Sequence, residues 1–255
     1  DYELTAQMLT EMIRRVVRFS VVKPRMIVCV PSGITEVEER AVIQAAMEAG
    51  ARRVYLIEEP LAAALGANLD ISAPEGHMVV DIGGGTTDIG VITMNGVAVS
   101  SSIKTAGIAF DEAIVKYVRK RFGVIIGANT AEEIKLSIGC VSPRPASLTM
   151  MVKGRDVRSG LAHEVTITSE EIMEVLRRPA RQIADKVLDV LEQATPELVA
   201  DISKNGILLT GGGSQLWGMD QVLRDRTEMP CVVADDADSC VAYGCGKSLG
   251  WMNHM

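Results

Sequence analysis

The chain has 255 residues, of which 47% are hydrophobic and 23% charged, enough to bury the core of one large domain or of two modest ones. A formal charge of −7 and an aromatic content of 4% argue against a dedicated nucleic-acid binder, which usually presents a basic face or aromatic stacking platforms. The five cysteines form no CxxC pair and the three histidines are scattered, which disfavours a zinc site or a disulfide framework.

The sequence contains no apolar run of the ~18 residues that a membrane span needs and no signal peptide, which predicts a cytoplasmic protein. Apolar side chains recur at helical spacing over residues 3–19 and predict an amphipathic helix. Because this pattern starts at once and no initiator methionine precedes it, we expect the sequence to be a fragment.

Two strand–helix units follow. The stretch "RMIVCVP" predicts a buried strand, and a capping box at Thr35–Glu38 opens a helix that ends near Gly50. The stretch "RVYLI" predicts the next strand, and Pro60 begins the alanine-rich helix "PLAAALGANL". This alternation implies parallel pairing in a layered α/β domain.

A meander of strands comes next. The strand "HMVVDI" runs into a turn at Gly83–Gly85 and then into a second apolar strand. Asn95-Gly96 lies between two strand-like runs, which is a strong signal for a hairpin.

The region 107–185 is richer in helix, and we expect it to form a separate subdomain. A helix is predicted over residues 107–122, and Thr130–Glu133 reads as a capping box that opens another. The stretches "SLTMMVKG" and "HEVTIT" predict a small hairpin. A long helix is then predicted from Thr168 to Gln193, with a kink at Pro179.

The last part of the chain repeats the pattern of an apolar strand followed by glycines. The stretch "GILLTGGGSQL" places Gly211–Gly213 directly after a strand. A helix over residues 216–227, a short strand "CVVA" and a helix from Asp238 complete the predicted elements.

The two glycine turns carry the functional signal. Backbone N–H groups in such turns can converge on phosphate oxygens without side chains in the way. The first turn is flanked by Asp81 and Asp88, and a carboxylate beside a polyphosphate needs a cation between them. We therefore expect Mg²⁺ and the terminal phosphates at the first turn, and the base, sugar or α-phosphate at the second. A turn-capping role for Asp81 is the alternative.

Two common nucleotide motifs are absent from the sequence. It contains no G-x-x-x-x-G-K-[ST] segment, so it is not a P-loop protein, and no G-x-G-x-x-G segment opens a helix with an acid downstream.

Several segments resemble one superfamily. "VVDIGGGTTD" resembles the second phosphate motif of the actin/Hsp70/sugar-kinase ATPases, and "LIEEPLAAALGANL" and "ILLTGGGSQL" resemble their connecting and adenosine motifs. Within that superfamily, "CVPSGITEVEERAV", "AEEIKLSIG" and "ADDADSCVAYGCGKSL" resemble the bacterial actin homologues of the MreB family, the rod shape-determining proteins.

The resemblance implies an α/β, actin-like ATPase (ribonuclease H-like) fold that lacks its N-terminal part and carries a smaller inserted α+β subdomain. Residues 1–77 and a C-terminal helix at about 237–255 would belong to the first actin-like domain. Residues 78–106 and 186–236 would form the second core domain, and residues 107–185 the inserted subdomain.

The resemblance also implies roles for individual residues. Glu59 matches the glutamate that orients or activates the attacking water, although it could equally cap the helix that follows, and Thr86 matches a residue that positions water. Asp81 matches the acid that holds Mg²⁺ through water, with Asp88 beside it. The implied nucleotide-binding residues are Gly83, Gly84, Gly85, Thr86, Thr87, Glu132, Glu133, Lys135, Gly211, Gly212, Gly213 and Ser214. For Glu132 and Lys135 a solvated ion pair is the alternative.

One departure from the family pattern concerns catalysis. The superfamily has an earlier phosphate hairpin with an Asp-x-Gly-Thr signature, and nothing resembling it occurs before Asp81. Since positioning and electrostatic clamping supply most of phosphoryl-transfer catalysis, we expect this chain to bind ATP weakly and to hydrolyse it little.

The segment "RFSVVKP" fits the position of the family's apolar membrane loop. Its membrane-contacting residues would be Phe19, Val21 and Val22, with ordinary core or loop packing as the alternative.

The function implied is an ATP- and Mg²⁺-dependent filament that maintains rod cell shape by organising cell-wall synthesis at the membrane. Its partners would be further copies of itself, the cytoplasmic face of the membrane and the cell-wall elongation machinery, with no nucleic acid. An Hsp70-like chaperone and a sugar kinase are the alternatives. The first would need a peptide-binding region after the nucleotide domain, and the second a substrate-binding acid for which we find no candidate.

Overall fold

A computed structural model of the chain describes residues 2–16 and 23–251. The strands in these ranges are β1 (Arg25–Val30), β2 (Arg53–Glu58), β3 (His77–Ile82), β4 (Thr87–Thr93), β5 (Gly96–Ile103), β6 (Val124–Ile125), β7 (Thr149–Asp156), β8 (Ala162–Thr168), β9 (Ile207–Thr210) and β10 (Cys231–Val233). The helices are α1 (Tyr2–Val16), α2 (Glu36–Glu48), α3 (Glu59–Gly66), α4 (Gly107–Phe122), α5 (Ala128–Ile138), α6 (Ser169–Gln193), α7 (Pro196–Asn205), α8 (Met219–Thr227) and α9 (Cys240–Trp251), with a 3₁₀ turn η1 (Gly212–Gln215).

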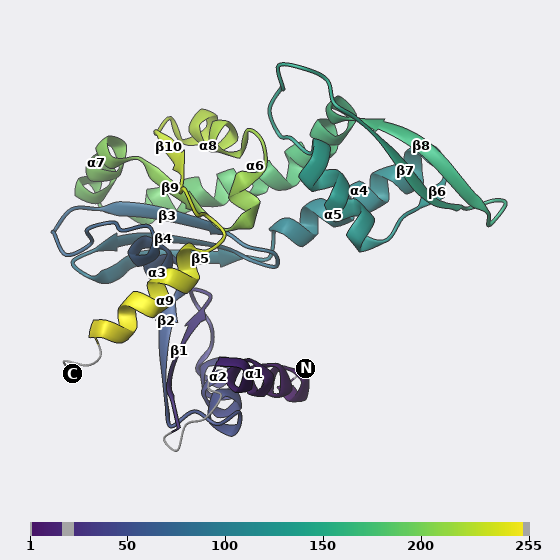
Figure 1. The fold of residues 1–255 in the computed structure, drawn as a ribbon. Helices are drawn as coiled ribbons and strands as arrows, with labels where there is room; N and C mark the ends of the chain where they lie inside the picture. The colour runs from purple at the N-terminus through teal and green to yellow at the C-terminus, as the bar shows by residue number, and fades with distance from the viewer. Residues whose placement is uncertain (1, 17–22, 252–255) are drawn as a thin grey trace.

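The central sheet has the strand order β10-β9-β3-β4-β5. Strands β10, β9 and β3 run parallel, whereas β4 and β5 are added as antiparallel hairpins. Helices α6 and α8 lie on one side of this sheet and α3 and α9 on the other, so it is the middle layer of a three-layer arrangement (Figure 1). The predicted α/β layering is confirmed.

Alternation along β3 decides which side chains reach the site. Met78, Val80 and Ile82 point into the core shared with α4 and α6, whereas Val79 packs with α3 and α9. Because side chains of a strand alternate between faces, Asp81 shares the α3 face with Val79. A carboxylate therefore stands on the side of the sheet where α3 begins.

Two glycines let α3 and α9 pack backbone against backbone. A Cβ on Gly66 would lie 1.8 Å from the carbonyl oxygen of Cys240, and a Cβ on Gly244 would lie 1.7 Å from that of Ala62. No side chain fits at either position, so these glycines set the contact that joins the C-terminal helix to α3.

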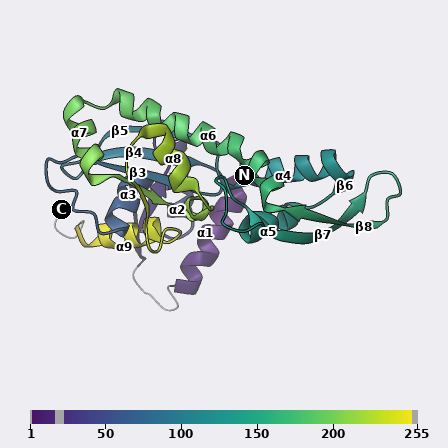
Figure 2. The same cartoon turned by 90° about the horizontal axis from the view of Figure 1, so that it is seen from above.

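A smaller sheet of order β6-β7-β8 packs with α4 and α5 and projects to one side of the central sheet (Figures 1 and 2). Its hydrophobic core is continuous with that of the central sheet through α4 and α6. The remaining strands, β1 and β2, form a separate parallel pair beside α2. The exact division into residues 1–77, 78–106 with 186–236, and 107–185 stays a prediction.

Most predicted elements are confirmed, including two of the capping boxes. Thr35 with Glu38, and Thr168 with Glu171, each exchange the reciprocal side-chain and backbone hydrogen bonds of that motif. Pro179 lies buried inside the long helix α6.

The third capping box is wrong. Helix α5 begins at Ala128, and its N-cap is Gly127 with extended backbone, so Thr130 lies inside the helix. Strand β6 pairs with β7, and the helix starts soon after this pair. The strand pairing, rather than the local capping preference, therefore sets the start of the helix. Helix α7, with Thr195 capping its first turn and Pro196 at its start, was not predicted.

The Asn-Gly hairpin is confirmed, but its turn is displaced by one residue. Thr93 pairs with Gly96, so Met94 and Asn95 are the two central residues, with φ of 47° and 61°. Their amide groups donate to the carbonyl oxygens of Ala73 (3.2 Å) and Ile71 (2.8 Å). These contacts fix a register that the local dipeptide alone does not specify.

Candidate functional site

The first glycine turn, Gly83–Thr86, joins β3 to β4 and is held by α4. The Gly83 amide donates to the Thr86 carbonyl (2.9 Å) and closes the turn. The carbonyl groups of Gly83 and Gly84 accept hydrogen bonds from the amides of Gly107 (3.0 Å) and Ile108 (2.8 Å). The turn is therefore fixed against the first residues of α4, and its outer side is left free.

Gly84 and Gly85 leave open space above that turn. A Cβ built on either residue meets no atom within 4 Å, and neither residue has a positive φ. The chain itself thus has no steric need for glycine at these two positions. A group that approaches the backbone from outside, such as a phosphate, explains both glycines.

Two buried carboxylates lie beneath the turn. Asp81 is 5% exposed, and its Oδ1 accepts a hydrogen bond from Thr210 Oγ1 at 2.8 Å. Burial raises the pKa of Asp81 to about 6, against the lowering effect of the Thr210 hydroxyl. Asp88 is fully buried; its Oδ1 accepts from the Ser32 amide at 2.8 Å, and its Oδ2 has no hydrogen-bond partner in the described part of the chain.

Glu59 joins these two acids from the first turn of α3. A Cβ on Gly90 would lie 2.7 Å from Pro60, so the absence of a side chain there lets the start of α3 settle onto β4. Burial, followed by the charge of Asp88, raises the pKa of Glu59 to about 8. The N-cap of α3 is Glu58, so Glu59 does not cap the helix.

The three acids suit a cation that is shared with a ligand. Within the described residues, no group of three or more His, Cys, Asp or Glu side chains is arranged to hold a metal ion by itself. Mg²⁺ is usually held by one or two carboxylates together with waters and substrate phosphates. Asp81 and Asp88, one of which has an unpartnered buried oxygen, fit that kind of site.

The two threonines after the glycines have different surroundings. Thr86 is half-buried within the turn, whereas Thr87 is fully buried and its hydroxyl donates to the Thr105 carbonyl at 2.7 Å. The hydroxyl proton of Thr87 is thus engaged by the protein backbone.

The second glycine turn follows β9. Gly211 has a φ of 79°, and a Cβ there would lie 2.4 Å from the Ile82 carbonyl oxygen, so the fold itself requires glycine. Ser214 is buried and its hydroxyl donates to the Gly211 carbonyl at 2.6 Å, which stabilises the turn. Gly212, by contrast, has nothing within 4 Å of a built Cβ and is the open position of this turn.

A cavity of about 170 Å³ lies beside the second glycine turn and reaches Gly107, whose amide holds the first turn. Residues from α4, α5, the segment after α5 and the second glycine turn line it: Gly107, Phe110, Lys135, Leu136, Gly139, Arg144, Gly212, Gly213, Gln215, Leu216 and Trp217. Tertiary folding thus brings the predicted Lys135 together with the predicted Gly212 and Gly213, although about 75 residues separate them in the chain.

Lys135 is already engaged at the wall of this cavity. Its ammonium group contacts the Asp111 carboxylate at 2.9 Å and donates to the Gly107 carbonyl at 3.3 Å. Glu132 and Glu133 are exposed and do not line the cavity. Glu132 precedes Leu136 by one turn and so lies on the same face of α5, and its contact with a ligand stays a prediction.

Four residues with evident roles at the site are not among those that the sequence predicts. Ser32 and Thr210 hold the two aspartates, and each stands at the end of a strand next to glycine, in "PSG" and "LTGGG". Arg144 lies with its guanidinium carbon 4.9 Å from the ring centre of Trp217, and both line the cavity. No rule of sequence spacing links residues so far apart in the chain. The one sequence signal for a functional role is that they lie on short loops after apolar elements.

Comparison with known proteins agrees with this architecture. The family model described as "MreB/Mbl protein" matches residues 1–255. The cell shape-determining protein MreB of Escherichia coli (strain K12) is 48% identical over 251 residues, which cover 98% of this chain and 72% of that protein.

Solved structures with the same fold include two of MreB5 from Spiroplasma citri. The one bound to ADP has a TM-score of 0.94 and the one bound to AMPPNP a TM-score of 0.92, both at 38% identity; they cover 99% and 100% of this chain, and 76% and 78% of theirs. The MamK double helical filament aligns with a TM-score of 0.82 at 19% identity, over 98% of this chain and 75% of its own, which shows a common fold.

Proposed function

The chain belongs to the MreB/Mbl family, and on that premise we propose that it is a nucleotide-binding, actin-like cytoskeletal protein that forms filaments and determines cell shape. The relatives carry the name of cell shape-determining proteins, and a relative of the same fold is bound to nucleotides. The observation from this chain that supports the proposal best is the open space over Gly84 and Gly85, which its own packing does not require.

The two glycine turns have distinct parts in the proposed site. The backbone of Gly83–Thr86 binds the terminal phosphates of ATP, and the cavity lined by Gly212, Gly213 and Lys135 receives the nucleoside. The opposite assignment is disfavoured because Asp81 and Asp88 both belong to the strands that the first turn joins, and a cation has to balance them there, although Asp81 also contacts the second turn through Thr210.

Asp81 and Asp88 would hold Mg²⁺ together with the phosphates. When bound, Mg²⁺ supplies charge neutralisation at the phosphate oxygens. Thr210 and the Ser32 amide keep one oxygen of each carboxylate engaged, so the other oxygens stay in a fixed direction.

Glu59 is the proposed residue that accepts a proton from the attacking water. Its pKa of about 8 means that it carries a proton at neutral pH while the site holds only carboxylates. A positive charge near Asp88 would favour the ionised form of Glu59, because it removes the like-charge contribution to that raised pKa. Glu59 would thus be able to accept a proton only when nucleotide and cation are present, and the extent of ATP hydrolysis by the chain stays a prediction.

Association with the membrane and with the cell-wall elongation machinery extends this proposal. The names of the relatives support a role in cell shape. No helix of the described residues is long and apolar enough to cross a bilayer. Phe19, Val21 and Val22, the predicted membrane contacts, lie outside the described residues.

Substitutions at the open glycines test the nucleotide site. A Cβ at Gly85 meets no atom within 4 Å, so Gly85→Val should fold, but its side chain occupies space above the turn and fluorescent ATP should bind at least about tenfold more weakly. Gly246→Val is the control, because a Cβ there also meets nothing within 4 Å. Equal affinities of the two variants would contradict the proposed site.

Light scattering separates filament formation from the alternatives. ATP-dependent scattering by the unchanged chain, reduced in Gly85→Val, supports a filament. ADP release that depends on an added sugar would instead indicate a sugar kinase.

A further inference from the structure

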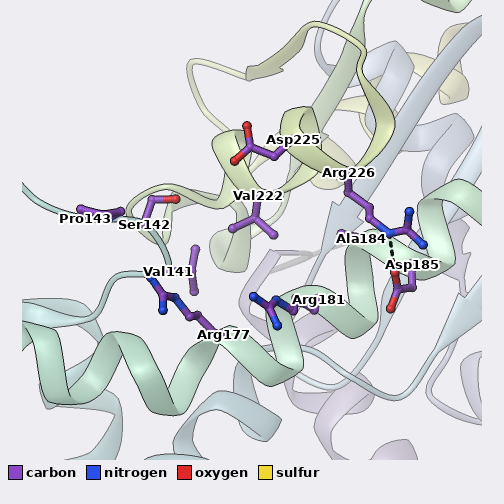
Figure 3. Close-up of a pocket in the computed structure, with 10 residues that line it drawn as sticks. All are labelled: Val141, Ser142, Pro143, Arg177, Arg181, Ala184, Asp185, Val222, Asp225 and Arg226. Carbon is purple, nitrogen blue, oxygen red and sulfur yellow. Dashed lines mark hydrogen bonds and ion pairs between the residues drawn. The ribbon is translucent and has the colours of Figure 1, made fainter.

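A second cavity, of about 530 Å³, lies between α6, α8 and the segment that follows α5 (Figure 3). It shares no lining residue with the cavity at the second glycine turn. Its volume falls within the range of roughly 300–1,000 Å³ that is typical of ligand-binding pockets. The nucleotide site proposed above makes no use of this cavity.

Three arginines surround it. Arg177 and Arg181 project from α6 one helical turn apart, and Arg226 comes from α8 (Figure 3). Arg177 pairs with Glu174 at 2.6 Å, and Arg226 pairs with Asp185 at 2.6 Å. Like charges at this spacing repel, and the carboxylates of Glu174 and Asp185 compensate two of the three.

Arg181 differs from the other two arginines of this cavity in its partners. It has no ion-pair partner among the described residues, and in Figure 3 its guanidinium group extends into the cavity on the side of Arg177 and Val141. A neighbouring cavity of about 390 Å³ shares Arg177, Arg181 and Asp185 and adds Arg178, with Glu174 and Gln182 also in its lining. In a chain of net charge −7, this concentration of positive charge favours an anionic ligand.

The floor of the cavity is apolar. Val141 and Ala184 are 2% and 1% exposed, and Val222, also in the lining, is half-buried and packs against the same core. A ligand that fits this lining presents an aliphatic group next to an oxyanion. Guanidinium groups bind carboxylates through paired, planar hydrogen bonds, which suits the two arginines on α6.

We propose that this cavity docks an acidic peptide segment of a protein partner, with a carboxylate on Arg181 and Arg177 and an aliphatic side chain over Val141 and Val222. The carboxylates of Asp185 and Asp225 also border the cavity, and they would repel a polyphosphate or a nucleic acid more strongly than a peptide that carries a few acids among apolar residues.

A labelled peptide of alternating glutamate and leucine residues tests this proposal. Its fluorescence anisotropy should rise on titration with the full chain at low salt, and a peptide with glutamine in place of glutamate should bind at least about tenfold more weakly. Arg181→Glu should weaken binding of the acidic peptide by about tenfold or more, and Arg181→Gln by less.

The matched control is Arg40→Glu, which makes the same change of charge at an 80% exposed side chain on α2. Its affinity should stay within about twofold of that of the unchanged chain. Several outcomes would overturn the proposal: no binding by the unchanged chain, equal binding of the glutamine peptide, equal losses in the Arg40 and Arg181 variants, or displacement of the peptide by tripolyphosphate at a lower concentration than by unlabelled peptide. Circular dichroism and thermal melting show whether each variant is folded.

Discussion

Asp81 and Asp88 are direct partners in the register of β3 and β4, and both are buried on the face of the sheet that α3 covers. Each carboxylate is oriented by a donor from a distant part of the chain, Thr210 for the first and the Ser32 amide for the second. Burial, together with the charge of Asp88, raises the pKa of Asp81 and of Glu59, so the nucleotide-free site is sensitive to pH.

The first prediction concerns stability against pH in the absence of nucleotide. The pKa of Glu59 rises from its ordinary 4.5 to about 8 on folding, so the native state retains a proton that the unfolded chain releases. The free energy of unfolding therefore falls as pH rises from 4.5 to 8. Glu59→Gln should flatten this dependence and raise the melting temperature at pH ~8.5 by about 2–4 °C, which corresponds to ~1 kcal/mol in a chain of this size.

The control for this experiment is Glu39→Gln, which changes an exposed acid on α2. Its melting temperature should follow that of the unchanged chain over the whole range. Parallel pH profiles for Glu59→Gln and the unchanged chain would show that Glu59 is not the titrating group.

The second prediction concerns the donor to Asp81. Thr210→Val keeps the shape of the side chain but removes the hydroxyl that lowers the pKa of Asp81. The carboxylate should then ionise less readily, and Mg²⁺-dependent nucleotide binding at pH ~6 should weaken by about threefold to tenfold. At pH ~8 the difference should shrink. An equal loss at both pH values would point to a packing defect instead.

The third prediction concerns the contact between α3 and α9. Gly244→Ala would place a methyl group 1.7 Å from the Ala62 carbonyl oxygen, so the helices must separate, and we expect a loss of about 2–4 kcal/mol in unfolding free energy. Gly246→Ala, two residues along the same helix, meets nothing within 4 Å and should be neutral or stabilise by up to ~1 kcal/mol. Urea unfolding of both variants measures the difference, and similar values would refute the close packing.

The fourth prediction separates folding from nucleotide binding at Lys135. The side chains of Lys135 and Asp111, which form an ion pair, are only 14% and 15% exposed. Lys135→Met should therefore lower the free energy of unfolding by about 3 kcal/mol, because it leaves a buried carboxylate unpaired. The double variant Lys135→Met, Asp111→Leu should recover most of that stability, because it removes both charges. If Lys135 contacts the nucleotide, the double variant should still bind fluorescent ATP more weakly; full recovery of binding would limit the lysine to a structural role.

Periodicity and turn chemistry predicted most elements, because both act over a few residues. The capping boxes at Thr35 and Thr168 are confirmed, since each helix there begins where its own side chains satisfy its first amides. Prediction failed at Thr130, where α5 already begins at Ala128, soon after the paired strand β6. It was off by one residue at the Asn95 turn, where hydrogen bonds to the carbonyl groups of Ile71 and Ala73 hold Met94 and Asn95.

The sequence by itself determined the two glycine turns, the acids that flank the first of them and the strands that precede both, because these features depend on neighbours in the chain. Only the tertiary structure decided which glycines serve the fold and which leave room for a ligand. The Ile82 backbone occupies the space that a Cβ on Gly211 would need, whereas the space next to Gly84 and Gly85 is empty of protein atoms. It also decided that Asp81, Asp88 and Glu59 share one buried site. Burial and like-charge contact depend on packing between segments far apart in sequence, such as α3 settling on Gly90, and no local pattern records that packing.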